Sequence, residues 1–194
     1  MIDSLRRTLR ERERRRLERS ERAAVLVPIV DDGAPLRLLL TRRTETLPTH
    51  QGHVAFPGGY VLPDEDDPIR TALREAEEEI GLSAESPEIL GLLDDVSTRT
   101  GTVAVTPVVG RLTGLRALTP SSAEVARIFT IPFDDLLRPE RWSVRIEAVP
   151  EGERRIHFFT HDGETLWGLS ARIVLNLLSL TPGGAPVVRE PGRA

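Results

Sequence analysis

The sequence predicts a fold of the α/β (α+β) class, in which a mixed central sheet is covered by helices on both faces. Short apolar runs typical of buried strands alternate with two segments of helical periodicity, in the order strands, helix, strands, helix. The first helix, 68–80, follows a loop rich in Gly, Pro and Asp over 57–67. The second, 166–180, is apolar at helical spacing and long enough to be a terminal core helix.

The 194 residues are expected to form one domain with short extensions. Residues 1–22 are dominated by Arg, Glu and Leu, which predicts a charged helix over 3–22 with a thin apolar stripe. We expect this helix to pack on the domain or a partner rather than to serve as an arginine arm for phosphates. Residues 23–181 contain the predicted domain, and the Pro- and Gly-rich tail, 182–194, is expected to be flexible.

Apolar runs and turn residues along the chain predict the strands. Two apolar runs flank the turn Asp31-Asp32-Gly33, so 23–41 predicts a hairpin. Further elements follow in order: strands at 54–56, 89–93, 103–112 and 124–130, a helical turn at 132–137, and a second hairpin of 142–148 and 155–160.

The ends of the helix at 68–80 are marked by capping residues. Asp67 is suited to the N-cap, and Pro68 then occupies the first helical position. Gly81 suits the left-handed position that ends a helix.

Four glutamates fall within five positions of this helix. At about 100° per residue, Glu75, Glu78 and Glu79 share one arc, whereas Glu77 projects elsewhere and is expected to be solvated. A neighbouring arc is apolar and can pack on a core. Like charges at these spacings repel each other unless a cation lies between them. Because Mg²⁺ prefers oxygen ligands, the three carboxylates predict a site for a divalent cation.

The glutamates belong to a longer pattern, Gly59-x5-Glu65-x8-Arg74-Glu75-Ala76-x-Glu78-Glu79-x-Gly81-Leu82. This pattern resembles the signature box of the Nudix hydrolases, and Arg74 to Leu82 matches that box without a gap. One extra residue stands between Glu65 and Arg74. The first glutamate of the box therefore corresponds either to Glu65 or to one of three neighbouring acids, Asp64, Asp66 and Asp67.

A second stretch is similar to the coenzyme A diphosphatase branch of that superfamily. It consists of Leu39-Leu40-Thr41-Arg42-Arg43-Thr44 and then Phe56-Pro57-Gly58-Gly59. Thr44 stands where the branch has Ser or Ala, and Pro48 where it has Arg. Later segments, 106–110 and 166–173, also resemble this branch, so the resemblance covers about residues 23–180.

The resemblance implies a Nudix-like α/β/α sandwich with a catalytic loop-helix-loop and hydrolysis of a diphosphate in a small molecule with the help of Mg²⁺ or Mn²⁺. The expected substrate is coenzyme A or a derivative, which would give 4′-phosphopantetheine and adenosine 3′,5′-bisphosphate. One alternative is a Nudix hydrolase of ADP-ribose or another nucleoside diphosphate derivative. Another is a non-catalytic nucleotide sensor, which the complete glutamate set disfavours.

The resemblance also implies roles within the motif. Glu75, Glu78 and Glu79 are the expected metal ligands, with Glu78 and Glu79 also counted as catalytic. Arg74 is expected to hold the glutamates in position by charge-assisted hydrogen bonds. Glu65 is a candidate partner of Arg74 or a ligand through water.

The general base is expected outside the box. Glu124, after the loop Pro120-Ser121-Ser122, is the first candidate for a base or further ligand. Asp94 and Asp95 are alternatives that we expect to be structural.

Candidate substrate-binding residues flank the glycine loop. Gly58 and Gly59 allow close approach and offer backbone N–H groups to phosphate. Arg42 and Arg43 are candidate phosphate ligands, and alternation along a strand means that only one, by the resemblance Arg43, is expected to reach the substrate. His50 is a candidate phosphate donor or base, as is the nearby residue His53.

Composition narrows the class of protein. A net charge of −4 argues against general nucleic-acid binding. The chain contains no cysteine and no lysine, which excludes disulfides, thiol catalysis and Schiff-base chemistry. No apolar run approaches the roughly 20 residues of a membrane span. We therefore expect a cytoplasmic protein without a membrane or nucleic-acid partner, and the sequence leaves a homodimer open.

Overall fold

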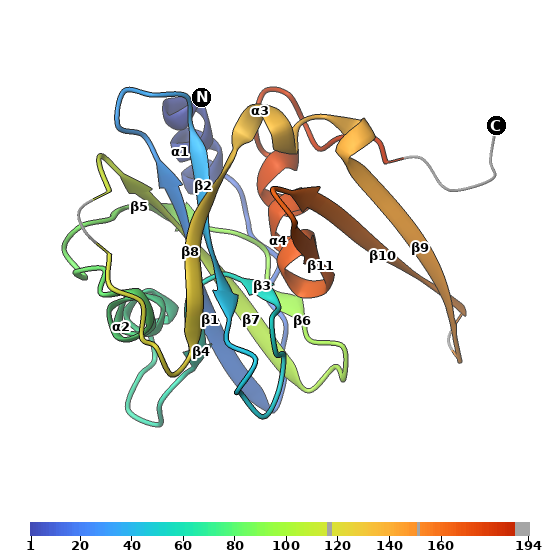
Figure 1. Ribbon diagram of the computed structural model, residues 1–194, viewed down its shortest axis with the longest axis horizontal. Helices are drawn as coiled ribbons and strands as arrows, with labels where there is room; N and C mark the ends of the chain where they lie inside the picture. The colour runs from blue at the N-terminus through green and yellow to red at the C-terminus, as the bar shows by residue number, and fades with distance from the viewer. Residues whose placement is uncertain (116–117, 151, 189–194) are drawn as a thin grey trace.

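The computed structural model describes residues 1–115, 118–150 and 152–188. Within them, a large mixed sheet lies between helices, and a three-stranded antiparallel sheet extends from one side (Figure 1). The large sheet contains β1 (Glu21–Val30), β2 (Arg37–Arg43), β3 (Val54–Ala55), β4 (Gly58–Tyr60), β5 (Glu88–Leu92), β6 (Val96–Ser97), β7 (Val103–Leu112) and β8 (Val125–Pro132). The smaller sheet contains β9 (Trp142–Val149), β10 (Gly152–His161) and β11 (Glu164–Trp167).

The centre of the large sheet is the parallel pair β1 and β7. These strands pair along their full length, from Glu21 opposite Val103 to Val30 opposite Leu112. The other edge of β1 pairs antiparallel with β4 near its start and with β2 near its end. The remaining pairs in this sheet are antiparallel, so the predicted mixed sheet is confirmed.

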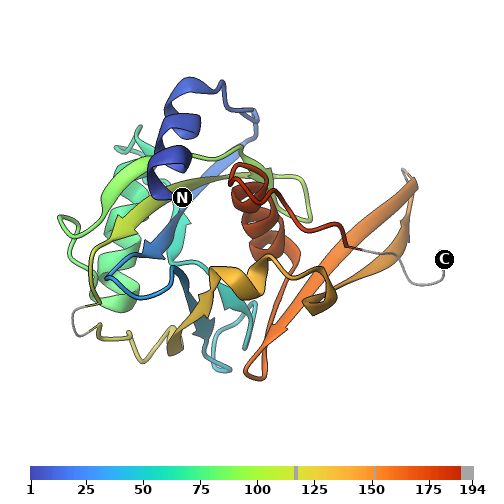
Figure 2. The ribbon, with the colours of Figure 1, turned by 90° about the horizontal axis from the view of Figure 1, so that it is seen from above.

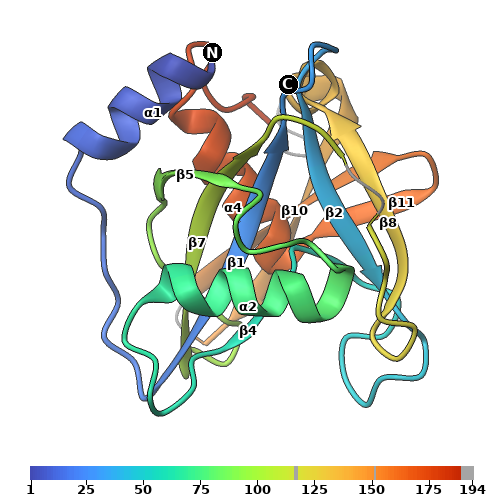
Figure 3. The same ribbon diagram turned by 90° about the vertical axis from the view of Figure 1, so that its left-hand side faces the viewer.

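Helices cover both faces of the sheet, as predicted. Helix α2 (Pro68–Ile80) packs on one face through Ala72, Ala76 and Ile80 (Figure 3). The opposite face is covered by α4 (Gly168–Ser179) and α1 (Ile2–Glu11), with a larger apolar core between them and the sheet (Figure 2). A short helix α3 (Phe133–Leu136) and a 3₁₀ turn (Pro139–Arg141) connect the two sheets. None of the helices in the described ranges is long and apolar enough to cross a membrane.

The predicted ends of α2 are confirmed. The side chain of Asp67 accepts a hydrogen bond from the backbone N–H of Ile69 over 2.9 Å, and Pro68 is the first helical residue. Gly81 has a φ of +67°, and its N–H donates to the carbonyl of Glu77 over 3.0 Å. The helix is thus fixed at both ends by its own sequence, which sets the direction of the glutamate face.

The helix predicted over 3–22 is shorter than expected, because α1 ends at Glu11. Residues 12–20 form no helix and lie along the turn after β5. Two carboxylates of that turn accept hydrogen bonds from the backbone and the arginine side chains of this segment. Asp94 accepts hydrogen bonds from Arg12 and from the backbone N–H of Arg15, and Asp95 accepts them from Arg14 and the N–H of Leu17. These bonds to distant residues replace the bonds that a continued helix would make.

The terminal helix also begins later than predicted. Glu164–Trp167 forms strand β11, which pairs with β10 from Phe158 opposite Trp167 to His161 opposite Glu164. The helix therefore starts at Gly168 rather than at 166. Residues 182–188 form no helix or strand, and 189–194 lie outside the described residues, so the flexibility of the tail stays a prediction.

Candidate active site

Arg74 lies at the centre of a hydrogen-bond network on α2. Its Nε donates to Oε1 of Glu65 over 3.0 Å, and its Nη1 donates to Oε1 of Glu75 over 2.7 Å. The same Nη1 is 3.3 and 3.4 Å from the two carboxylate oxygens of Glu78, and Nη2 donates to the carbonyl of Tyr60 over 3.2 Å. One guanidinium thus connects the loop before α2 with two of the three predicted ligands.

Among the four acids considered for the first position of the box, Glu65 is the one that meets Arg74. Its carboxylate is buried and also accepts a hydrogen bond of 2.7 Å from the hydroxyl of Thr71. The hydrogen bonds from Arg74 and Thr71 lower the pKa of Glu65 to about 2. Asp67 instead caps the helix, whereas Asp64 and Asp66 are exposed. Glu65 is therefore ionised across the neutral pH range.

Glu75 lies directly against the glycine loop. A Cβ at Gly59 would stand 2.5 Å from the carboxyl carbon of Glu75, which is far inside van der Waals contact. Burial raises the pKa of Glu75, and the nearby charges of Glu78 and Glu124 raise it further. Arg74 lowers this pKa but does not cancel the rise. Glycine at 59 is thus what allows this carboxylate to lie beside strand β4.

Glu79 is buried one turn further along the helix. Its Oε1 is 3.9 Å from Nη1 of Arg43, which projects from the end of β2. Burial raises the pKa of Glu79 to about 7, with Glu124 and Glu75 adding to the effect. Arg43 and the backbone N–H of Gly58 oppose that rise without cancelling it. In such surroundings, any added positive charge favours the ionised form of the carboxylate.

Arg43 and Arg42 point in different directions, as strand alternation predicts. Arg42 donates to Glu45 over 2.9 Å, and its Nη1 is 4.0 Å from Glu164. Arg43 faces Glu79, and its buried Nε has no hydrogen-bond partner within the described part of the chain. Of the two arginines, Arg43 is therefore the one that retains an unused donor beside the carboxylates.

Glu124 approaches the same place from the end of the loop just before β8. Its carbonyl accepts a hydrogen bond of 2.9 Å from the N–H of Thr44, which holds the loop before β8 against the end of β2. Its carboxylate is close enough to raise the pKa of both Glu75 and Glu79. Glu124, the first candidate for the general base, thus lies near the predicted ligands. The alternatives, Asp94 and Asp95, instead bind the N-terminal segment.

The two histidines lie on the loop between β2 and β3. The N–H of Arg43 donates to the carbonyl of His53 over 3.0 Å, so His53 is anchored beside the site. Burial, with the charges of His50 and Arg43, lowers the pKa of His53. His50 is exposed and adopts a φ of +58°, and its ring centroid is 5.2 Å from that of His53.

The donor set suits a hard divalent cation. Glu75, Glu78 and Glu79 offer only carboxylate oxygens, and burial makes the charged forms of two of them unfavourable without a cation. Within residues 1–115, 118–150 and 152–188, no three acidic or histidine side chains already converge as closed metal ligands. One nitrogen of Arg74, Nη1, contacts both Glu75 and Glu78, whereas Arg43 faces Glu79.

Sequence reasoning missed two contributors to this arrangement. Thr71, in the first turn of α2, donates to Glu65, and the carbonyl of Tyr60 accepts from Arg74. A threonine on the helix face below the glutamates is a weak signal of the first contact. No side-chain pattern signals the second, because it uses the backbone.

Comparisons with known proteins find relatives over most of the chain. A family model described as the NUDIX domain matches residues 20–152. An uncharacterized Nudix hydrolase, NudL, from Photorhabdus laumondii is 38% identical over 160 residues, which cover 82% of this chain and 84% of that protein. NudL from Yersinia pestis is 39% identical over 159 residues, which cover 81% of this chain and 78% of that protein.

Solved structures share the fold at lower identity. A MutT/nudix family protein from Enterococcus faecalis gives a TM-score of 0.58 at 20% identity, covering 88% of this chain and 65% of that one. A NUDIX hydrolase from Nitrosomonas europaea gives 0.55 at 14% identity, covering 90% of this chain and 78% of that one. These structures show the shared fold, and the family model and the NudL relatives show that the chain belongs to the Nudix hydrolase family.

Proposed function

We propose that this chain is a divalent-cation-dependent hydrolase that splits the diphosphate of coenzyme A or a derivative into 4′-phosphopantetheine and adenosine 3′,5′-bisphosphate. The observation that carries the proposal is the grouping of Glu75, Glu78 and Glu79 beside Arg43, the arginine whose Nε is buried without a partner among the described residues. An acidic face supplies cation ligands, and an arginine with an unused donor supplies a contact for phosphate.

In this proposal the three glutamates hold Mg²⁺ or Mn²⁺. When bound, the cation supplies charge neutralisation at the diphosphate and makes water more acidic. Arg74 fixes Glu75 and Glu78 through the hydrogen bonds described above, and so acts as a positioning residue. Glu65 fixes Arg74 in turn.

The substrate contacts come from the elements around the helix. Arg43 donates from its guanidinium to a phosphate oxygen, and the loop of Gly58 and Gly59 lets that phosphate approach the backbone. Glu124 takes a proton from the attacking water at its carboxylate. His50, next to His53 on the loop between β2 and β3, contacts the nucleotide or pantetheine part of the substrate. Arg42 points away from this site, toward Glu45 and Glu164, and has no role in the proposal.

Preference for coenzyme A rests on the stretch from Leu39 to Thr44 and the glycine loop, which resemble the coenzyme A branch. The test incubates the purified chain with coenzyme A and with ADP-ribose, each with millimolar Mg²⁺ or with EDTA, and identifies the products by mass spectrometry. Production of 4′-phosphopantetheine only with Mg²⁺ supports the proposal. Turnover of ADP-ribose without turnover of coenzyme A favours the broader Nudix alternative, and no turnover of either substrate favours a sensor.

A further inference from the structure

The small sheet of β9, β10 and β11 has an outward face that carries a row of planar side chains. Its other face packs on α4 and the core through residues such as Trp142, Phe159 and Leu166. Along β9 and β11, buried and exposed residues alternate, so that Ser143, Arg145 and Trp167 are exposed. Figures 1 and 2 show this sheet extending away from the body of the protein.

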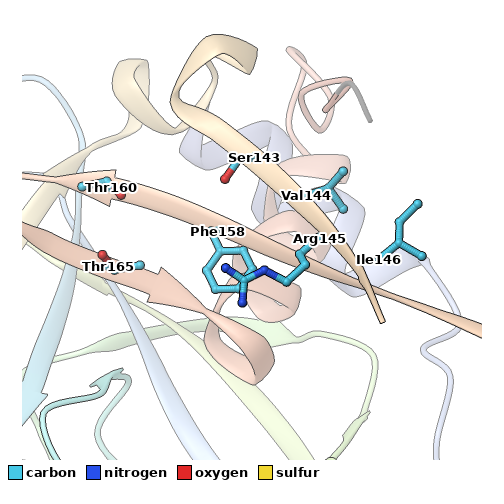
Figure 4. A pocket seen from close by; sticks show the side chains of 7 residues that line it. All are labelled: Ser143, Val144, Arg145, Ile146, Phe158, Thr160 and Thr165. Carbon is cyan, nitrogen blue, oxygen red and sulfur yellow. The ribbon is translucent and has the colours of Figure 1, made fainter. Parts of the chain in front are cut away.

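The planar groups lie next to one another in space, one on each of the three strands. The guanidinium carbon of Arg145 is 5.1 Å from the ring centroid of Phe158, and Figure 4 shows it lying over that ring. The rings of Phe158 and Trp167 are nearly parallel, at 10°, with centroids 5.9 Å apart. Trp167 then meets the ring of His53 edge-on at 4.8 Å, and His53 is followed by His50.

Two members of the row, Arg145 and Phe158, line a cavity of about 550 Å³, and Trp167 stacks on Phe158 beside it. Its lining includes one cation, Arg145, and the hydroxyls of three residues, Ser143, Thr160 and Thr165 (Figure 4). No acidic side chain lines it among the described residues. The volume is in the range of sites for small molecules. A hollow that combines a stacking surface, hydroxyls and a single positive charge suits a planar heteroaromatic ring that carries phosphate.

The row leads toward the glutamate face of α2. His53 is bonded through its carbonyl to the N–H of Arg43, and Arg43 faces Glu79. The strand residues Phe158, Thr160, Thr165 and Trp167 lie after residue 152, where the match to the family model ends. Arg145 lies on β9, within the match, so this surface combines a strand that the family model covers with two strands mostly beyond it.

The geometry points to a nucleotide subsite on this face: the adenine ring of the substrate stacks on Phe158 and Trp167, and Arg145 pairs with a phosphate of the same nucleotide. This inference rests on the proposed function in assuming that the substrate contains an adenine nucleotide. Arg145 is exposed, so it can turn from the Phe158 ring toward the phosphate without unfolding the sheet.

Equilibrium binding tests the subsite without any turnover. The full chain in EDTA is titrated with adenosine 3′,5′-bisphosphate while tryptophan fluorescence is recorded. Trp142 is buried in the core, whereas Trp167 is 36% exposed beside the proposed subsite, so stacking should quench Trp167. The variant Trp167→Leu should lose the response, and 4′-phosphopantetheine, which has no aromatic ring, should give none.

Kinetics provide the second readout. We expect Arg145→Gln and Phe158→Leu to raise KM for coenzyme A about tenfold while kcat changes less than twofold, because binding at a distance from the cleaved bond acts on substrate and transition state alike. Arg10→Gln, at an exposed arginine of α1, is the matched control and should change neither constant.

Three results would overturn the subsite: no quenching of the wild-type chain at millimolar bisphosphate, an unchanged KM in both variants, or a change of oligomeric state in Arg145→Gln with nucleotide affinity intact, which would identify the face as an interface between copies. The proposed function can fail while the subsite stands. A chain that cleaves no diphosphate but binds the bisphosphate through Trp167 refutes the hydrolase and retains the subsite.

Discussion

Arg74 and Glu65 are joined by two hydrogen bonds, from Nε to Oε1 over 3.0 Å and from Nη2 to Oε2 over 3.4 Å. Two parallel bonds between a guanidinium and a carboxylate fix orientation as well as distance. Arg74 is therefore held in the direction in which its Nη1 meets Glu75 and Glu78. The loop before α2 thus controls where two of the proposed ligands lie.

This relationship predicts a pH-dependent loss of stability in Glu65→Gln. The folded pKa of Glu65 is about 2, below its usual value of 4.5, so ionised Glu65 stabilises the folded state above pH 4.5. That stabilisation is lost as the pH falls toward 2. The variant should lose about 1–3 kcal/mol at pH 7. In urea titrations at pH 7, 4 and 3, the difference from wild type should shrink with falling pH; a constant difference would contradict the account.

Glu79→Gln should have the opposite effect on stability. Because the folded pKa of Glu79 is raised to about 7, the folded state holds this proton more tightly than the unfolded state, and stability falls as the pH rises from 4.5 through 7. In EDTA, the neutral amide should therefore stabilise the protein at pH 8 by on the order of 2 kcal/mol. At pH 4 the gain should vanish. Thermal unfolding at both values checks this, and destabilisation at pH 8 would contradict it.

Gly59→Ala should impair turnover with little loss of stability. The added Cβ would stand 2.5 Å from the carboxyl carbon of Glu75, so that side chain has to move away. We expect kcat to fall at least about tenfold, since small displacements at a reacting centre are costly. Gly114→Ala is the matched control, because its Cβ would meet nothing within 4 Å. Equal activity in the two variants would show that the position of Glu75 is unimportant.

Asp95→Ala should release the segment 12–20. Asp95 is buried and accepts hydrogen bonds from Arg14, from the N–H of Leu17 and from the hydroxyl of Thr106. Losing them should destabilise the protein by about 2–4 kcal/mol. Trypsin should then cleave after the arginines of this segment much faster than in wild type. Glu13→Gln is the control, and unchanged cleavage in Asp95→Ala would contradict the docking.

Local chemistry made α2 predictable from the sequence. Asp67, Pro68 and Gly81 act within one turn of the helix ends, so both ends were found at the right residues. The same holds for the opposite directions of Arg42 and Arg43, which follow from strand alternation. These features depend on neighbours in the chain and need no tertiary information.

Features that depend on distant residues were not predictable. The helix expected over 3–22 ends at Glu11, because Asp94 and Asp95 bind the following segment from about 80 positions away. Leu166 and Trp167 fit an apolar helix by spacing, but pairing with β10 makes them a strand. The close contact of Gly59 with Glu75 likewise appears only when β4 and α2 are placed together.

The central claim is that the glutamate face of α2 drives cleavage of a diphosphate. The pair Glu78→Gln and Glu77→Gln tests it most directly, because both residues are exposed on the same helix and only Glu78 meets Arg74. Turnover of coenzyme A with Mg²⁺ should fall more than about 100-fold in Glu78→Gln and remain near the wild-type rate in Glu77→Gln. Near-normal turnover in Glu78→Gln, in a protein that unfolds like wild type, would contradict the account.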